Sequence, residues 1–281
     1  MQTNTILAEL SGSSRQSLAQ AQSHLNNVLQ GLTSAECTRV SAELFGFVTA
    51  LDSTSALRRF LTDSARPSSE KSALVDKLLM GGAHSVTVKI LHAAVNSRWS
   101  SASDISDAIE ILAIESEAQS AHVNNELEKL ESELFQVAQI LVEHPDLSQE
   151  LASTNYTHEA KLNLVNRVFK EKVSNSTMRL VERLAVGSRG RKMEAIIRHY
   201  ISAVVARRER TIAHIKTAVG ISEEQKKRLA QLLSKMIGQE VRLNIEIDNK
   251  VLGGISIRFA DELIDATIVS RLADAGRALA V

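Results

Sequence analysis

The histidines are the first candidates for metal binding, because paired imidazoles at short helical spacing are common zinc ligands. His84 and His92 lie eight residues apart, and His199 and His214 fall in different expected elements. None of the eight histidines forms an H-x-x-x-H or HExxH pair. The sequence therefore predicts no metal site.

Glycine pairs occur at Gly81-Gly82 and Gly253-Gly254, but neither carries a nucleotide-binding frame. Both lack the lysine and serine of a Walker loop and the spacing of a G-x-G-x-x-G turn. The segment GSRGR at 187–191 also differs from the G-x-S-x-G elbow of serine hydrolases. We expect this chain to bind no nucleotide or other cofactor by itself.

Carboxylates are plentiful, yet none is paired within an apolar stretch that would raise its pKa for acid–base catalysis. Asp265, between Ile264 and Ala266, comes nearest, and a turn or capping role is the favoured interpretation. The single cysteine, Cys37, is expected to be a partly buried small hydrophobe rather than a reactive thiol. We predict no catalytic residue and interpret the chain as an interaction protein, not an enzyme.

The composition favours helices and excludes a strong overall field. The 281 residues carry 33 basic and 33 acidic side chains, so the net charge attracts neither nucleic acid nor an anionic membrane. Prolines number two, and aromatic residues make up 3% of the chain, which is typical of long helices with aliphatic cores. The N-terminus does not resemble a signal peptide, and no window reaches the roughly 18 apolar residues of a spanning helix. Membrane attachment would depend on another subunit.

Charge is unevenly distributed in the second half of the chain. Residues 179–216 hold ten basic residues against three glutamates, a net charge of +7, whereas residues 119–178 hold five basic and nine acidic residues, a net charge of −4. One interpretation is a basic face that attracts an acidic partner helix or an anionic surface. The other is a solvated face that the acidic segment neutralises. Nucleic acid is a weaker candidate, because Tyr200 is the only aromatic residue in the basic stretch.

Helical periodicity covers residues 13–32, 34–51 and 117–143, and the sequence also contains an internal repeat. Residues 56–118 align with residues 145–209 at an offset of about 90. Each copy is expected to form a short helix, a lysine-containing helix, a further helix and a last long one. Two occurrences are too few for a solenoid, so we predict duplicated bundles. The matched pairs are Leu57 with Leu147, Leu61 with Leu151, Lys71 with Lys161, Leu74-Val75 with Leu164-Val165, Thr87 with Thr177, Lys89 with Arg179, and Ile105 with Ile196.

The chain after the second copy changes its periodicity. Residues 211–219 alternate like a strand, and Ser222 with Gln225 forms a capping-box signature at the start of a helix. The buried face of this helix is expected to comprise Leu229, Leu232, Leu233, Met236 and Ile237.

Residues 241–248 and 255–259 then alternate between apolar and polar side chains, with Gly253-Gly254 between them. We expect these two segments to pair as a hairpin. Residues 263–266 are expected to lead into an amphipathic helix that closes the unit and extends to Leu279.

These patterns predict a mainly α fold: N-terminal helical bundles with an internal duplication, followed by a small α+β C-terminal domain. We place the first bundle at 1–118, the second bundle at 119–209 and the α+β domain at 210–281. The last domain is close to the lower size limit for independent stability, so we expect it to need a partner or the neighbouring bundle.

The run VRLNIEIDNKVLGGISIRFADELIDATIVSRLADAGRALA resembles the C-terminal signature of the delta subunit family of the F-type ATP synthase, which includes the mitochondrial oligomycin-sensitivity-conferring protein. Ala266-Thr267 stands where that family usually has Gly-Ser. The second helical copy occupies the place of the family's N-terminal bundle, so the chain resembles an extended form with an extra first copy. The matching landmarks are Ile247-Asp248, Gly253-Gly254, Ile257-Arg258, Asp261, Ile264-Asp265 and Arg271-Leu272.

The resemblance implies a non-catalytic peripheral-stalk subunit, one copy per complex, that resists rotor torque during proton-driven ATP synthesis. A helical bundle of such a subunit holds the N-terminal helices of the alpha subunits, and the C-terminal unit holds the end of the membrane-anchored b subunit. It also implies peripheral attachment on the cytoplasmic side of the cell membrane, through partner subunits only, and no nucleic acid. Two modest contacts on one stiff chain strengthen each other through effective concentration.

Partner binding is expected near the C-terminus and in the basic stretch. Two alternatives remain open: a helical adaptor unrelated to ATP synthase, and a basic-patch binder of nucleic acid or membrane surfaces, whose affinity would fall steeply with salt. The candidate partner-binding residues are Leu252, Gly253, Gly254, Leu263, Asp265, Ile268, Arg271, Leu272, Leu279, Arg207, Arg208 and Arg210.

Overall fold

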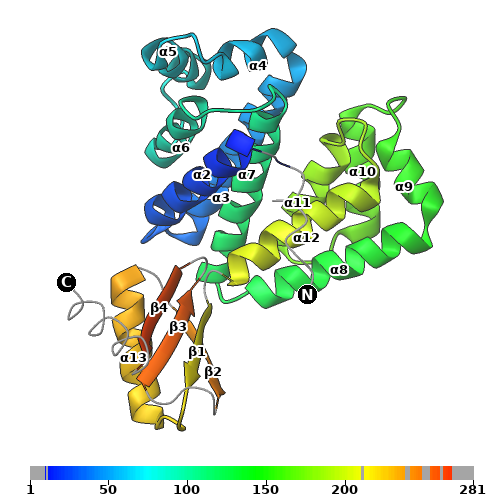
Figure 1. Ribbon diagram of the computed structural model, residues 1–281. Coiled ribbons are helices and arrows are strands. Elements are labelled where there is room, and N and C mark those ends of the chain that lie inside the picture. Colours follow the sequence, from blue (N-terminus) through cyan, green and yellow to red (C-terminus); the bar gives the residue numbers. More distant parts are fainter. Residues whose placement is uncertain are drawn as a thin grey trace. The chain divides into compact units, whose positions relative to one another are not determined.

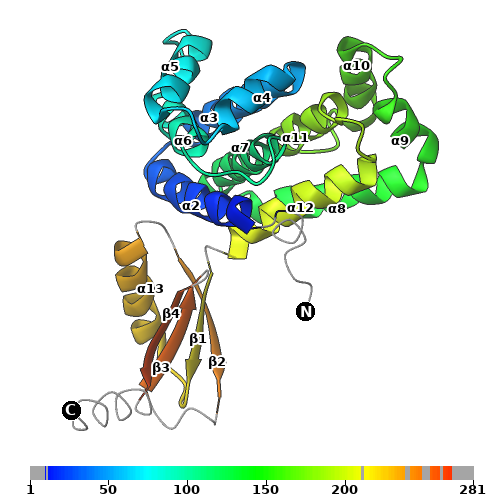
Figure 2. The same cartoon turned by 45° about the horizontal axis from the view of Figure 1, so that its top comes forward.

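The helical periodicity of the first 209 residues and the alternation after them are both realised in the computed structural model, which forms helices first and a mixed sheet afterwards (Figures 1 and 2). The structure describes residues 10, 12–209, 212–237, 241–248, 254–259 and 262–267. The chain divides into two compact units, Met1–Val205 and Ala206–Val281. The predicted mainly α class with a small α+β C-terminal part is confirmed. The separate boundary at residue 118 stays a prediction.

The internal duplication is confirmed by helix boundaries that recur at an offset of 90 residues. It begins one helix earlier than the sequence repeat, because α3 and α8 also correspond. The first series is α2 (Gly12–Leu29), α3 (Ser34–Ser53), α4 (Ser55–Thr62), α5 (Ser68–Leu79), α6 (Ser85–Val95) and α7 (Asp104–Val123). The second is α8 (Leu127–Glu143), α9 (Pro145–Ala152), α10 (His158–Phe169), α11 (Asn175–Val186) and α12 (Met193–Glu209).

One carboxylate in each copy caps a later helix. In the first copy, Glu43 of α3 accepts hydrogen bonds from the backbone N–H of His84 and from the hydroxyl of Thr87. These groups belong to the start of α6, where backbone donors have no partner within the helix. In the second copy, Glu133 accepts the equivalent hydrogen bonds from the backbone N–H of Ser174 and the hydroxyl of Thr177, each residue ninety positions later. The duplication therefore extends to individual hydrogen bonds.

We expect Glu133→Gln to lower the free energy of unfolding by about 1.5–3 kcal/mol, because it weakens hydrogen bonds to a charged acceptor. Burial opposes ionisation of this carboxyl, but the donors on Ser174 and Thr177 hold its pKa below the ordinary value of 4.5. A lowered folded-state pKa means that the carboxylate stabilises the fold above its unfolded pKa, and that this contribution is lost as the pH falls through the folded pKa. Urea unfolding at neutral and acidic pH measures both effects. The difference in unfolding free energy between wild type and variant should narrow on acidification, and substitution of an exposed glutamate, Glu159→Gln, should show neither effect.

Helix α7 forms the buried centre of the helical unit, with α2, α3 and α11 packed around it (Figures 1 and 2). Its residues are buried almost without exception from Ile105 to Ala121, including serines and glutamates. A helix buried on all sides has no solvated face, so its polar side chains need hydrogen-bond partners within the protein.

The helix expected over residues 117–143 is interrupted, so that prediction is wrong. Helix α7 ends at Val123, Asn125 adopts the left-handed conformation with φ of 59°, and α8 begins at Leu127. Asparagine tolerates this conformation better than most residues. The leucine stripe of the sequence belongs to α8 alone.

The C-terminal unit holds a four-stranded sheet in the order β2-β1-β3-β4, with α13 (Glu223–Ile237) on one face (Figure 2). The strands are β1 (Ile212–Thr217), β2 (Arg242–Ile247), β3 (Gly254–Phe259) and β4 (Glu262–Thr267). The predicted pairing of 241–248 with 255–259 is wrong, because β1 lies between β2 and β3. Strand β1 pairs parallel with β2 and antiparallel with β3. The helix between β1 and β2 supplies the crossover that a parallel pair requires.

Strand β4 replaces the expected lead-in to a helix. Residues 262–267 pair antiparallel with β3, and Asp265 lies opposite Ser256 in the register. The predicted turn or capping role of Asp265 is therefore wrong, since the residue sits within a strand. Isoleucine and threonine in this segment favour an extended backbone, and the neighbouring strand supplies the missing hydrogen bonds. The amphipathic helix expected up to Leu279 lies outside the described residues.

The start of α13 agrees with its capping-box signature. The backbone N–H of Ser222 donates to Gln225 Oε1 at 2.8 Å, and the backbone N–H of Gln225 donates to Ser222 Oγ at 3.2 Å. Leu229 and Leu233, one turn apart, pack into the sheet core, but Leu232 is 53% exposed, so its predicted burial is wrong. The sheet covers a narrower stripe of the helix than the five apolar residues suggested.

Candidate functional site

Three buried glutamates of α7 bind side chains of its neighbours, and two of them reach the second copy. Glu115 accepts a hydrogen bond from Gln22 of α2 at 2.6 Å, within the first copy. Glu117 accepts two from Arg179 of α11, at 3.1 and 2.5 Å, and thus reaches the second copy. Glu110, the third, lies at the centre of a larger cluster.

Glu110 receives donors from the second copy alone. Its carboxylate pairs with Arg189, accepts from Arg191 Nη2 at 3.0 Å and accepts from the hydroxyl of Tyr200 at 3.2 Å. The Glu110 side chain is 3% exposed. Burial raises the pKa of the Tyr200 hydroxyl well above 10.0, and the Glu110 charge raises it further, so the hydroxyl remains a donor.

Arg189 extends the cluster to two further carboxylates. Its Nη1 lies 2.8 Å from Asp107 Oδ1, and its Nε lies 3.5 Å from Asp52 Oδ2 at the end of α3. Burial raises the pKa of both aspartates, although the Arg189 charge opposes the rise. The residue takes a left-handed φ of 50°, and Gly190 follows with a φ of 74°. This sharp turn brings the guanidiniums of Arg189 and Arg191 to the same carboxylate, that of Glu110.

The cluster is a structural ion network rather than an acid–base centre. Every carboxylate in it faces a guanidinium of the other copy, and the network lies between packed helices. Perturbed pKa values are typical of reaction centres, but buried ion pairs produce them equally. We interpret this ion network as the set of contacts that holds the two copies together. Its members are Asp52, Asp107, Glu110, Arg189, Arg191 and Tyr200.

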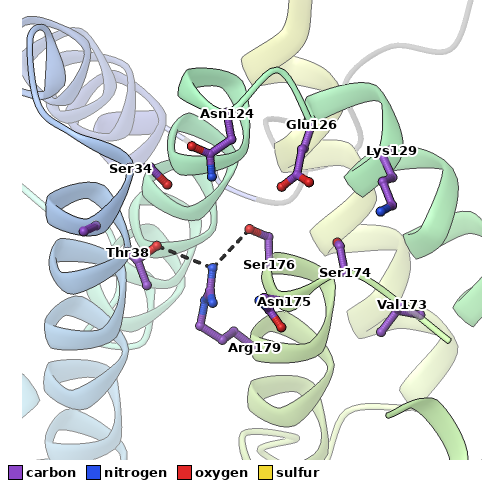
Figure 3. A pocket seen from close by; sticks show the side chains of 11 residues that line it. Ser34, Thr38, Asn124, Glu126, Lys129, Val173, Ser174, Asn175, Ser176 and Arg179 are labelled. Atoms are coloured by element: carbon purple, nitrogen blue, oxygen red, sulfur yellow. Dashed lines mark hydrogen bonds between the residues drawn. The ribbon is translucent and has the colours of Figure 1, made fainter. Parts of the chain in front are cut away.

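The other end of the same seam opens into a groove of about 700 Å³ (Figure 3). It lies between the start of α3, the junction of α7 with α8, and the start of α11. Figure 3 shows the Arg179 guanidinium between Thr38 and Ser176, whose hydroxyls it contacts at 3.5 and 3.1 Å. The lining residues are Ser34, Ala35, Thr38, Asn124, Glu126, Lys129, Val173, Ser174, Asn175, Ser176 and Arg179.

The groove offers hydroxyls and charges of both signs, and its lining includes neither histidine nor cysteine. Such a surface suits the polar side chains of a partner segment better than proton transfer. Across the described part of the chain, no three His, Cys, Asp or Glu side chains converge as metal ligands would. Every helix there falls short of the length and apolar character that crossing a bilayer requires.

Part of the basic stretch is neutralised inside the helical unit. Arg179, Arg189 and Arg191 bind carboxylates of α7, and Arg183 lies 5.5 Å from the ring centre of Phe45. The acids that pair with Arg179, Arg189 and Arg191 come from α3 and α7, not from residues 119–178. Sequence reasoning missed these pairs because their partners lie some sixty or more residues away along the chain. The predicted basic face at residues 179–216 therefore has fewer charges at the surface than the sequence suggested.

The predicted partner-binding residues fall in different places. Arg207 is buried and Arg208 is half-buried, so Arg207 presents no charge at the surface. Gly254 begins β3 with a φ of 83°, and Leu263 and Asp265 lie in β4. A role of these residues in partner binding stays a prediction. The predicted residues outside the described part of the chain are Arg210, Leu252, Gly253, Ile268, Arg271, Leu272 and Leu279.

The architecture is that of a scaffold protein. It joins a duplicated helical unit, held together by a buried ion network, to a small α+β unit. The family model described as "ATP synthase delta (OSCP) subunit" matches residues 116–279. Proteins named ATP synthase subunit delta share this similarity over nearly the full chain. Those of Streptomyces griseus and Streptomyces coelicolor are each 34% identical to it, over 96% and 98% of this chain and 100% of each relative. That of Thermobifida fusca is 36% identical over 96% of this chain and 100% of its own length.

The chain therefore belongs to the ATP synthase delta (OSCP) subunit family. It is a non-catalytic, peripheral-stalk subunit of the F-type enzyme and works within that membrane-bound complex. Because the relatives are covered along their whole length, the extra first copy is a feature that they share.

Proposed function

We propose that this subunit links the catalytic head of the ATP synthase to its membrane-anchored part through two separate contacts. The helical unit holds the N-terminal helices of the alpha subunits, and the α+β unit holds the C-terminal end of the b subunit. The chain is present once per complex and reaches the cytoplasmic side of the cell membrane through these partners alone.

The division of the chain into two compact units, each with its own apolar core, carries this proposal. A link under torque needs two attachment points that do not share one surface. The ion network stiffens the helical unit, because separating the two copies would leave buried charges without partners. Helix-in-groove contacts suit the surfaces between its helices.

Cross-linking mass spectrometry on the assembled complex tests the assignment of partners. We expect lysines of residues 12–205 to link to alpha subunits and lysines of residues 206–281 to link to the b subunit. The same preparation should show one copy of this chain per complex by native mass spectrometry. Links from both units to one partner, or a chain that co-purifies with no other subunit, would contradict the proposal.

A further inference from the structure

Arg189 is shared by three carboxylates of the ion network. Its Nη1 lies 2.8 Å from Asp107 Oδ1 and its Nε lies 3.5 Å from Asp52 Oδ2, while its Nη2 pairs with Glu110. One guanidinium carries a single positive charge, so it does not balance three negative charges held within its reach. Carboxylates brought this close together repel one another, and the repulsion is strong where the protein excludes water.

Two of the three carboxylates contact a second guanidinium. Glu110 accepts a hydrogen bond from Arg191 Nη2 at 3.0 Å, and Asp52 Oδ1 lies 3.8 Å from Arg58 Nη1. Within the described part of the chain, the Asp107 carboxylate is at ion-pair distance from the shared guanidinium alone. The negative charge of Asp107 is therefore the least compensated of the three.

Asp107 is also the most exposed of these carboxylates. Its side chain is 36% exposed, against 24% for Asp52 and 3% for Glu110. A proton can therefore reach it from solvent while the helices stay packed. Burial raises the pKa of the Asp107 carboxyl above the ordinary value of 3.8; the Arg189 charge opposes the rise, and the Glu110 charge adds to it.

We propose that Asp107 is a proton-binding site, and that the proton it takes up in mild acid tightens the contacts between α7 and the second copy. The neutral carboxyl no longer repels Glu110 and Asp52, and Arg189 then balances two negative charges instead of three. The ion network thus becomes a pH-sensitive element of the helical unit. This role does not depend on which subunits the chain contacts.

Other charged and titratable groups face Asp107 from every element packed around it. The arginines among them stay charged in mild acid, and the tyrosine stays neutral. The imidazole of His199 is the chief alternative acceptor of a proton, and its charge would lower the pKa of Asp107. The groups are Asp52 of α3, Arg58 of α4, Glu110 of α7, Arg189 and Arg191 of the turn before α12, and His199 and Tyr200 of α12.

Urea unfolding of the full chain from neutral pH down to about pH 4 tests the proposal, with Asp107→Asn as the variant. Because the folded-state pKa lies above the unfolded value, the folded chain binds more protons, and its stability rises as the pH falls from the folded pKa towards 3.8. We expect wild type to gain stability relative to Asp107→Asn on acidification. The limit for one proton is about tenfold in the folding equilibrium constant per pH unit.

Two further variants identify the proton acceptor. Asp146→Asn removes an exposed aspartate from α9 and should leave the pH dependence of wild type unchanged. In a His199→Gln background, the gain that depends on Asp107 should persist. A difference between wild type and Asp107→Asn that stays constant or shrinks in acid, or a gain that disappears in the His199→Gln background, would overturn the proposal.

A titration of the wild-type chain requires no substitution. Carboxyl-carbon NMR of the isotope-labelled protein follows the protonation of Asp107 directly, and its midpoint in the folded chain should lie above 3.8. A midpoint at or below this value would refute the proton site, whatever the unfolding measurements give.

Discussion

Glu110→Ala should destabilise the helical unit by about 3–5 kcal/mol, because it removes the common acceptor of a buried network and leaves two guanidiniums facing each other. Glu110 is the one carboxylate that both Arg189 and Arg191 contact, and the hydroxyl of Tyr200 also donates to it. Asp107 and Asp52 remain near Arg189, and the charge of Asp107 also acts on Arg191. Urea unfolding of the purified full chain measures the loss.

A matched control and a double variant identify the cause. Glu159→Ala removes an exposed glutamate from α10 and should change the stability by no more than about 0.5 kcal/mol. Glu110→Gln combined with Arg191→Gln should cost less than the two single changes added together, because the second change removes a charge that the first leaves unpaired. Additive losses would show that the two side chains do not interact in the folded state.

The helical part of the fold could be predicted because its information is local. Repeated spacing placed the helices of both copies, and the capping signature at Ser222 located the start of α13. The leucine stripe of residues 127–141 also predicted a helix that is present, but the pattern did not predict the turn at Asn125 that separates it from α7. Turn formation at a single left-handed residue leaves hydrophobic periodicity almost unchanged.

Strand pairing and the ion network could not be predicted, because both depend on residues far apart along the chain. Alternation predicted strands at 241–248 and 255–259, which correspond to β2 and β3, but it did not predict that β1 would lie between them. The arginines of the GSRGR segment were visible only as local positive charge, since their carboxylates lie on α3 and α7. Local sequence patterns span only about ten residues, so they cannot show that two residues about eighty positions apart will form a pair.

Phe45→Ala and Phe135→Ala should differ greatly in cost, although the two phenylalanines occupy equivalent positions of the repeat. Phe45 is 6% exposed and lies beside Tyr200 and Arg183, so its truncation opens a cavity at the seam and should cost about 3–5 kcal/mol. Phe135 is 52% exposed, so the same change should cost about 0.5 kcal/mol or less in the isolated chain. Urea unfolding measures both values under identical conditions.

The two substitutions remove the same side chain from equivalent positions of α3 and α8. Any difference in their cost therefore measures the contribution of the residues that cover Phe45. Equal losses of stability for the two variants in the isolated chain would mean that α8 is already covered, and the distinction between the two copies would then fail.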